Sequence, residues 1–273
     1  MFNRVQAAEP DTAMLWQDKS LVLSALGRPQ EAARVNREVL NSYNQVLQKQ
    51  PQNAKVWLAQ AQFLTQIEKF RKAIIAYNRV IELKPNSAQA WLGKGKAFAQ
   101  LDQNESALSA LDKALQISPE SYLTWQALGK IYQNNLNNLS QALASYDRGI
   151  AVNSSYAPLW RDRGITLNQQ GNYTQGIGSL IKASEIAPQD QINWIALASV
   201  WDEIGQDNKA LTALDRALEI QPQDPEIWSQ KGLIYTKNGQ YNEACQTYRE
   251  SLVAISDPST ITVSMKTLGC RLN

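Results

Sequence analysis

The chain has 273 residues, of which 44% are apolar, and this is enough for a sizeable packed core. A net charge of +2 gives no support for a nucleic-acid partner or an anionic membrane surface, and no run of eighteen apolar residues predicts a membrane span. Histidine is absent, and the two cysteines, Cys245 and Cys270, lack the spacing of a disulfide framework or a thiolate metal site, so we expect no metal and no cofactor.

The N-terminal segment FNRVQAAEP, residues 2–10, is similar to YNRVIELKP, residues 77–85. The aromatic residue, the NRV triplet and the closing proline fall at the same offsets. Because residues 77–85 belong to the second helix of a repeated unit, residues 1–12 are predicted to be the second half of a preceding unit. The chain is then either a slice of a longer array or a chain with half-repeats as its atypical ends.

Tryptophan marks a repeat that runs through the rest of the chain. From Trp57 onward the intervals between successive ladder tryptophans are 34, 34, 35, 34 and 34 residues. Small residues and prolines form two further ladders with the same intervals, and Ser154 occupies one proline slot. The ladders are Trp57, Trp91, Trp125, Trp160, Trp194 and Trp228; Ala73, Ala107, Ala142, Gly176, Ala210 and Ala244; and Pro51, Pro85, Pro119, Pro188 and Pro222. Three ladders in one register predict a repeat architecture.

Each unit has the pattern of two helices. Trp57, Ala61 and Leu64 fall at i, i+4 and i+7, which predicts the apolar stripe of a first helix. A turn follows, plainest in GNY at 171–173, where glycine suits a helix C-cap. A second stripe begins at the small-residue ladder, and proline ends the second helix. We expect large side chains to face small ones between the two helices.

The period is broken at two places, and one helix contains an unusual pair of glycines. The interval from Trp16 to Trp57 is 41 residues, and residues 31–50 contain no breaker, so we predict an extended second helix there. One extra residue within 134–140 predicts a looser turn. Gly176 and Gly178 are interpreted as close packing or a soft joint, because no strand precedes them and a phosphate loop needs one.

These ladders resemble the tetratricopeptide repeat over nearly the whole chain. The resemblance implies an all-α fold, a right-handed α-solenoid of antiparallel helix-turn-helix repeats whose first helices line a concave groove. One departure is regular, because Lys94, Arg163 and Lys231 stand where the family usually has leucine. We expect their alkyl stems to pack while their charges reach water.

A single array is predicted to span residues 1–273. The C-terminal segment places Ile261 in the tryptophan slot and Met265 and Leu268 at the next stripe positions, so it is predicted to be a first helix without its second. The predicted boundaries are 1–12 for the half-repeat, 13–53 for repeat one with its extended helix, 54–87, 88–121, 122–156, 157–190, 191–224 and 225–257 for repeats two to seven, and 258–273 for the partial helix.

The first helices supply the candidate binding site. By the resemblance, the residues one, five, eight and nine after each tryptophan face the groove. Amides predominate there, which suits the backbone of a peptide, and three cations would favour a carboxylate. The predicted groove residues are Gln62, Gln66, Lys96, Gln100, Gln126, Lys130, Gln133, Arg161, Asn168, Gln169, Ser199 and Asp202. The alternative is a merely solvated wall. The Lys and Asn pattern with which some family members clamp chaperone C-termini is not reproduced.

The leading functional hypothesis is a non-catalytic scaffold that binds an extended or helical peptide segment in its groove. Without histidine, and with Cys245 predicted to be a small packed side chain, no catalytic residue is assigned. The alternative is a regulatory or targeting segment of a larger, catalytic protein. End-to-end self-association is a further alternative, and an RNA-binding helical repeat has little support from the charge. The cysteine usage and the lack of a visible signal segment favour the cytoplasm.

Overall fold

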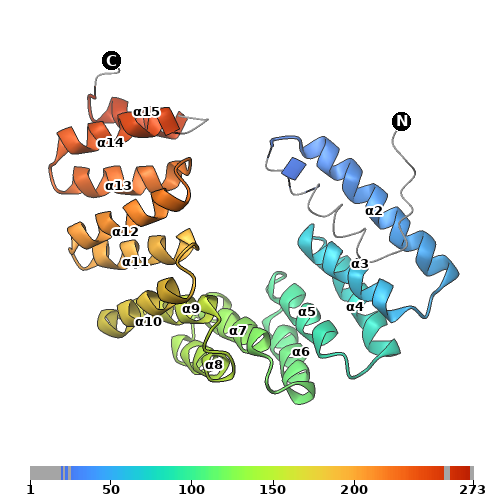
Figure 1. Cartoon of the computed structure of the whole chain (residues 1–273). Coiled ribbons are helices and arrows are strands. Elements are labelled where there is room, and N and C mark those ends of the chain that lie inside the picture. The colour runs from blue at the N-terminus through green and yellow to red at the C-terminus, as the bar shows by residue number, and fades with distance from the viewer. Residues whose placement is uncertain (1–19, 21, 24–25, 255–258, 271–273) are drawn as a thin grey trace. The chain divides into compact units, whose positions relative to one another are not determined.

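The computed structural model describes residue 20 and residues 22–23, 26–254 and 259–270. Its helices are α2 (Pro29–Lys49), α3 (Ala54–Gln66), α4 (Phe70–Leu83), α5 (Ala88–Ala99), α6 (Asn104–Ile117), α7 (Tyr122–Lys130), η1 (Ile131–Asn135), α8 (Leu139–Val152), α9 (Ala157–Gln169), α10 (Tyr173–Ile186), α11 (Gln191–Glu203), α12 (Asp207–Ile220), α13 (Pro225–Lys237), α14 (Tyr241–Ala254) and α15 (Ser259–Thr267) (Figure 1). No strand occurs among the described residues, which confirms the predicted all-α class. The predicted half-repeat 1–12 and Trp16 lie outside the described residues.

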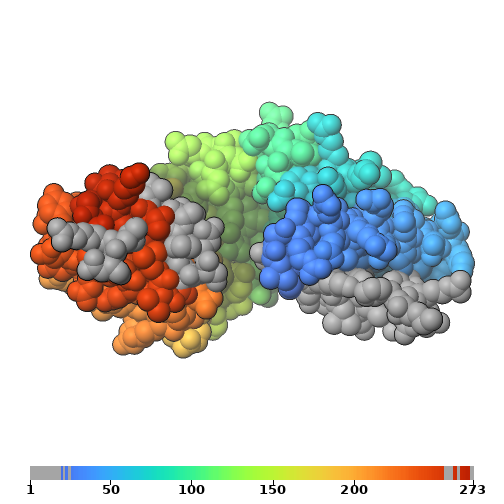
Figure 2. Space-filling model, turned by 90° about the horizontal axis from the view of Figure 1, so that it is seen from above, coloured from blue at the N-terminus to red at the C-terminus, as the bar shows by residue number. Residues whose placement is uncertain are grey.

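The chain divides into two compact units, Met1–Asn137 and Asn138–Asn273. In the first unit, α3 packs on α4 and α5 packs on α6, and each pair packs on the next. The helix α2 has 21 residues and is the long helix predicted there; its blue surface is visible in Figure 2. The boundary between the units falls inside the predicted repeat four, so the single array remains a proposal.

The second unit repeats the same hairpin three times. The pairs α9–α10, α11–α12 and α13–α14 each pack internally, and α15 packs on α14 (Figure 1). Ile261 is fully buried and Met265 is 1% exposed against Tyr248, so an isoleucine takes the place of the ladder tryptophan in α15. Paired helices joined by short turns and stacked pair on pair are the arrangement of an α-solenoid.

The turns inside the hairpins require a backbone with positive φ. Gly171, Gly205 and Gly239 have φ between +71° and +78°, as the sequence predicted. In the first unit Glu68 and Asp102 adopt positive φ at the equivalent turns, with φ of 59° and 55°. Glycine is therefore the preferred residue at this position and not an obligatory one, because the left-handed conformation costs other residues only about 1–2 kcal/mol.

The extra residue of repeat four lies in a π-helical turn instead of only in a loose loop. The amide of Leu136 donates to the carbonyl of Ile131 at 3.1 Å, which is an i→i−5 bond. The side chain of Asn135 then donates to the carbonyl of Ala99 at 3.2 Å. The prediction placed the extra residue in the turn after the helix. The π-helical turn instead accommodates it at the end of the helix.

Each ladder tryptophan makes a hydrogen bond to the loop that precedes its own helix. The indole Nε1 donates to the backbone carbonyl six residues earlier at 2.8–3.0 Å in all six repeats. The acceptor is the carbonyl of the ladder proline for five of these tryptophans and that of Ser154 for Trp160. This bond explains why the tryptophan and proline ladders share one register, and why serine is tolerated, since only the carbonyl is used.

Two of the three cations that replace leucine are held by carboxylates of the preceding hairpin and do not simply extend into water. Arg163 pairs with Asp147 at 2.7 Å and also donates to Ser179 at 2.6 Å. Lys231 pairs with Asp215 at 2.6 Å and its side chain is only 15% exposed. Lys94 has its Nζ 4.9 Å from the ring centroid of Trp91. The expected stem packing is present, and carboxylates sixteen residues earlier hold two of the three charges.

The two glycines of α10 have different surroundings. A Cβ on Gly176 would overlap Oδ1 of Asn168 and lie 3.0 Å from the carbonyl oxygen of Gly164, whereas a Cβ on Gly178 would meet nothing within 4 Å. Gly176 thus replaces the ladder alanine because Asn168 occupies the space. The close-packing interpretation holds for Gly176 and not for Gly178.

We expect Gly176→Ala to lower the free energy of unfolding by about 1–2 kcal/mol, because overpacking outweighs the helix-propensity gain of about 1 kcal/mol. Gly178→Ala is the matched control in the same helix and should raise stability by up to about 1 kcal/mol. Adding Asn168→Ala to Gly176→Ala should recover most of the loss in urea unfolding. Equal effects of the two glycine substitutions would contradict this assignment.

Cys245 and Cys270 form a disulfide, which corrects the prediction that the cysteines are unpaired. Their Cα atoms are 5.5 Å apart, within the usual range. Cys245 lies in the first turns of α14 and Cys270 just after α15. The separation of 25 residues concealed the pairing, because an antiparallel helix pair returns the end of α15 to the start of α14.

Candidate functional site

The first helices of the first unit form one wall. α3 packs beside α5, and α5 packs beside α7. The predicted groove residues Gln62, Gln66, Lys96, Gln100 and Lys130 are exposed on this wall, as a binding surface requires. Two others are less accessible: Gln133 is half-buried, and Gln126 is only 8% exposed.

Lys130 on α7 is close enough to Lys96 on α5 to repel its charge. The pKa of Lys96 is lowered, first because burial among surrounding groups weakens its solvation and second because Lys130 repels its charge. The side chain is nevertheless open to solvent. An ammonium group that is accessible but poorly solvated, beside a second cation, is a favourable position for a ligand carboxylate.

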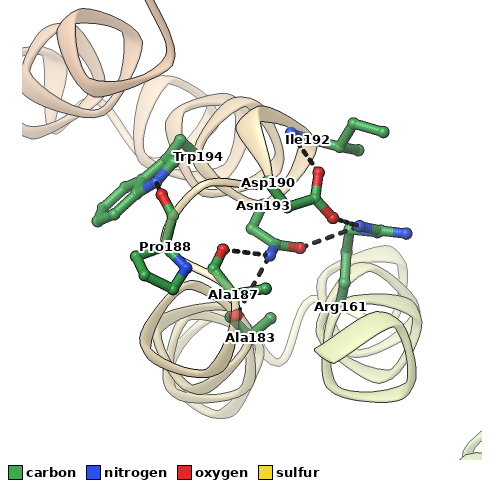
Figure 3. Close-up of polar contacts among 8 residues, drawn as sticks. All are labelled: Arg161, Ala183, Ala187, Pro188, Asp190, Ile192, Asn193 and Trp194. Atoms are coloured by element: carbon green, nitrogen blue, oxygen red, sulfur yellow. Dashed lines mark hydrogen bonds and ion pairs between the residues drawn. The ribbon is translucent and has the colours of Figure 1, made fainter. Parts of the chain in front are cut away.

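In the second unit, Arg161 belongs to a structural network and is not an available cation. Its Nη1 pairs with Oδ2 of Asp190 at 2.8 Å and donates to Oδ1 of Asn193 at 3.0 Å (Figure 3). The Arg161 side chain is 14% exposed. Asp190 also caps α11 by accepting from the amide of Ile192 at 3.1 Å. A ligand carboxylate would therefore have to displace Asp190 in order to pair with Arg161.

Asn193 completes this network from the protein interior. It is fully buried and donates to the carbonyls of Ala183 and Ala187 at 3.2 and 3.3 Å (Figure 3). These carbonyls lie at the end of α10 and beside it, so one amide side chain joins α11 to α10 and, through Arg161, to α9. The network fixes the position of α11 beside α9, and it thereby shapes the surface between them.

The other predicted residues of this unit have mixed roles. Asn168 is 8% exposed and packs against Gly176, with neither amide atom hydrogen-bonded to a described residue. Gln169 and Ser199 are exposed. Asp202 accepts from Lys237 at 2.8 Å, so its charge is already compensated.

Two hollows follow one another on the first helices of the second unit. The larger has a volume of about 690 Å³ and lies between α9 and α11, with Asn168, Gln169 and Ser199 among its lining residues. The smaller, about 420 Å³, lies between α11 and α13 and includes Asp202. Ser199 lines both. Three of the predicted residues thus share one hollow, whose size falls within the usual range for ligand pockets.

Sequence reasoning placed too much weight on polar side chains at this site. The hollow between α9 and α11 is also lined by Ile192 and Tyr173, which lie outside the stripe positions used for prediction. Tyr173 belongs to the GNY turn, and Ile192 stands two residues before a ladder tryptophan. An isoleucine in the first turn of a helix, where polar residues are usual, is the sequence signal that could have indicated Ile192. In the structure its side chain is 52% exposed.

The described residues contain no group of three or more acidic or cysteine side chains that could hold a metal ion. Among the same residues, no helix combines the length and the hydropathy that crossing a bilayer requires. The surface offers hydrogen bonds, charge and apolar hollows, which are the elements of a binding site.

Several solved structures share this fold at low sequence identity. The Cut9–Hcn1 hetero-tetramer of the APC/C matches with a TM-score of 0.65 and 18% identity over 97% of this chain, which spans 57% of the matched chain. PilW, a type IV pilus biogenesis factor, matches with a TM-score of 0.65 and 18% identity, covering 72% of this chain and 91% of PilW. A tetratricopeptide repeat protein from Parabacteroides merdae matches with a TM-score of 0.62 and 16% identity over 94% of this chain and 98% of its own.

Comparison with curated proteins gave no significant sequence match. Family models of the tetratricopeptide repeat match residues 37–88 and 58–122, and a further one matches residues 227–261. A model described as TPR repeat matches residues 203–239. Together these matches cover more than half of the chain and include repeats of both units. The hairpins, the ladders and these matches agree, and the chain belongs to the tetratricopeptide repeat family.

Proposed function

We propose that the chain is a non-catalytic scaffold that binds an extended or helical segment of another protein along its first helices. The exposed amides of α3 and α5 can donate to and accept from a peptide backbone. YrrB, a TPR protein with an unusual peptide-binding site, has the same fold with a TM-score of 0.50 and 20% identity, over 69% of this chain and 97% of YrrB. That likeness supports the class of ligand and not its identity.

The observation that carries the proposal is the pair Lys96 and Lys130. Burial and repulsion by Lys130 both lower the pKa of Lys96, so both factors disfavour its charged form. A ligand carboxylate between the two cations would stabilise that charge and add charge-assisted hydrogen bonds. We therefore assign the first unit a preference for peptides with an acidic side chain or a free C-terminus.

An array of ten-residue peptides tests this preference. Peptides with Glu would be compared with the same sequences carrying Gln, and free C-termini with amidated ones, so that the two sources of carboxylate are distinguished. We expect the double variant Lys96→Glu, Lys130→Glu to bind the carboxylate peptides about tenfold more weakly or worse. Lys72→Glu with Lys113→Glu is the matched control, because both lysines are exposed on second helices of the same unit.

The affinity should also depend on pH. Because the pKa of Lys96 is lowered, its charge is lost at a lower pH than that of an ordinary lysine. Carboxylate binding should therefore weaken as the pH rises through the Lys96 pKa, while the peptide carboxylate stays ionised. Equal binding of Glu and Gln peptides, or of the double variant and its control, would overturn the proposal.

The disulfide changes the expectation for location. Cysteine usage and the lack of a visible signal segment favour the cytoplasm, and the disulfide removes the first of these two grounds. Structural disulfides persist in oxidising compartments and are rare in the cytosol. The pairing of Cys245 with Cys270 therefore argues against a reducing compartment.

A further inference from the structure

The hollow between α9 and α11 has an apolar interior. Ile165 on α9 and Ile195 and Val200 on α11 line it, and Ile192 stands at its edge with 52% of its surface exposed. An isoleucine left this open to water loses part of the free energy that burial would provide, about 25 cal/mol per Å² of apolar surface. The chemistry of the interior therefore suits a bulky apolar group.

The edge of the hollow carries negative charge. The hydroxyl of Tyr173 donates to Oε1 of Glu203 at 3.0 Å, which holds the carboxylate at the lining. Within the described part of the chain Glu203 has no ion-pair partner. Lys237, which approaches the adjacent residue Asp202, is already paired with that carboxylate. A cationic group on the ligand would complement this edge.

The second hollow indicates that the ligand is a chain. It lies between α11 and α13, shares Ser199 with the first, and has Leu233 at its edge with 57% of its surface exposed. Two consecutive hollows, each with an exposed aliphatic side chain, fit successive side chains of one peptide better than they fit a compact small molecule.

We propose that the α9–α11 hollow binds a bulky apolar side chain of a peptide whose neighbouring lysine or arginine pairs with Glu203. The occupant is a segment of a partner protein with an apolar residue next to a basic one. This inference rests on the proposed scaffold function, but its site lies in the second unit and its charge preference is opposite to that of Lys96 and Lys130. The two sites can therefore succeed or fail independently.

A library of random seven-residue peptides displayed on phage tests the proposal by selection on the immobilised chain. The enriched sequences should contain Leu, Ile, Met or Phe within two positions of Lys or Arg. Binding of a selected peptide should fall about tenfold or more in Ala196→Trp, because Ala196 lines the hollow and the indole would fill it. Ala151→Trp is the matched control, since Ala151 is exposed on α8 of the same unit.

Two surface substitutions keep the test decisive if the Ala196→Trp variant does not fold. Ile192→Glu should abolish binding, because it replaces an exposed apolar contact by a charge. Glu203→Lys should weaken binding of the selected basic peptide and favour the same peptide with its basic residue changed to Glu, whereas Glu250→Lys, on the exposed surface of α14, should change nothing.

The outcomes separate this site from the carboxylate site of the first unit. The selected peptides should bind equally well to the double variant Lys96→Glu, Lys130→Glu. Loss of binding in that variant, enrichment of no sequence that joins an apolar residue to a basic one, or unchanged binding to Ala196→Trp and Ile192→Glu would each overturn the proposal. Failure to enrich any sequence would also overturn it.

Discussion

Replacing Asn193 with leucine is expected to lower the free energy of unfolding by about 3 kcal/mol. Leucine has nearly the same size as asparagine, so the expected loss of stability comes from lost hydrogen bonds and not from a cavity. The substitution removes both bonds to the carbonyls of Ala183 and Ala187 and the acceptor for Arg161 at 3.0 Å. Because Asn193 is fully buried, methyl groups would face a guanidinium and two carbonyls that water reaches only in part, and such groups cost about 1–3 kcal/mol each when left unpaired.

In the Asn193→Leu variant the carbonyls of Ala183 and Ala187 each keep one backbone hydrogen bond, which limits the loss of stability. Ala183 still accepts from the amide of Ala187 and Ala187 from that of Asp190. Urea unfolding followed by circular dichroism measures the total effect, and hydrogen exchange of α10 and α11 shows whether the loss is local. Asn208→Leu, on the exposed surface of α12, should change stability by less than about 0.5 kcal/mol. An Asn193→Leu protein as stable as this control would refute the role of the network.

A double-mutant cycle with Arg161→Met tests whether the two residues act together. Methionine keeps an apolar stem and removes the charge, so the capping bond of Asp190 to Ile192 remains. Residues that share a network show coupling energies of about 0.5–3 kcal/mol, so the double variant should lose clearly less than the sum of the two single losses. This coupling would confirm that Arg161 stabilises the fold.

The repeat and its two helices could be predicted from the sequence, because they depend on contacts within one hairpin. A stripe at i, i+4 and i+7 reports the buried face of a helix, and the start and end signals stand beside it. The length of α2 followed from the same reasoning, since residues 31–50 contain no breaker and the helix has 21 residues.

The availability of side chains at the site could not be predicted. A stripe position predicts only the direction in which a side chain points. Arg161 occupies the same stripe position as Ile195 and Leu92, directly after the ladder tryptophan. Its internal role depends on Asp190 and Asn193, which lie on either side of the boundary to the next repeat, 29 and 32 residues later. The pairing of Cys245 with Cys270 and the hollow at Ile192 likewise depend on contacts between different helices, which no single helical period encodes.

Trp125→Ala is expected to lower the free energy of unfolding by about 3 kcal/mol, at the lower end of the range for tryptophan truncation. The indole is half-buried, and it packs on the cluster of α5, α6, α7 and η1 that includes Leu111 and Ile131. It also donates to the carbonyl of Pro119 at 2.9 Å. The expected loss therefore has two parts, the apolar contact and the bond that fixes the preceding loop.

Trp125→Phe separates these two parts, because phenylalanine keeps a ring in the cluster and removes the Nε1 donor. A neutral hydrogen bond contributes about 0.5–1.5 kcal/mol, so this variant should lose about 1 kcal/mol for the bond, with a further small loss for the narrower ring. Trp160→Phe is the matched test of the mechanism, because its acceptor is the carbonyl of Ser154. If the bond to the carbonyl matters and the proline ring does not, both phenylalanine variants should lose similar stability in urea. A Trp125→Phe protein with wild-type stability would show that the indole acts through packing alone, and the shared register of the two ladders would then need another cause.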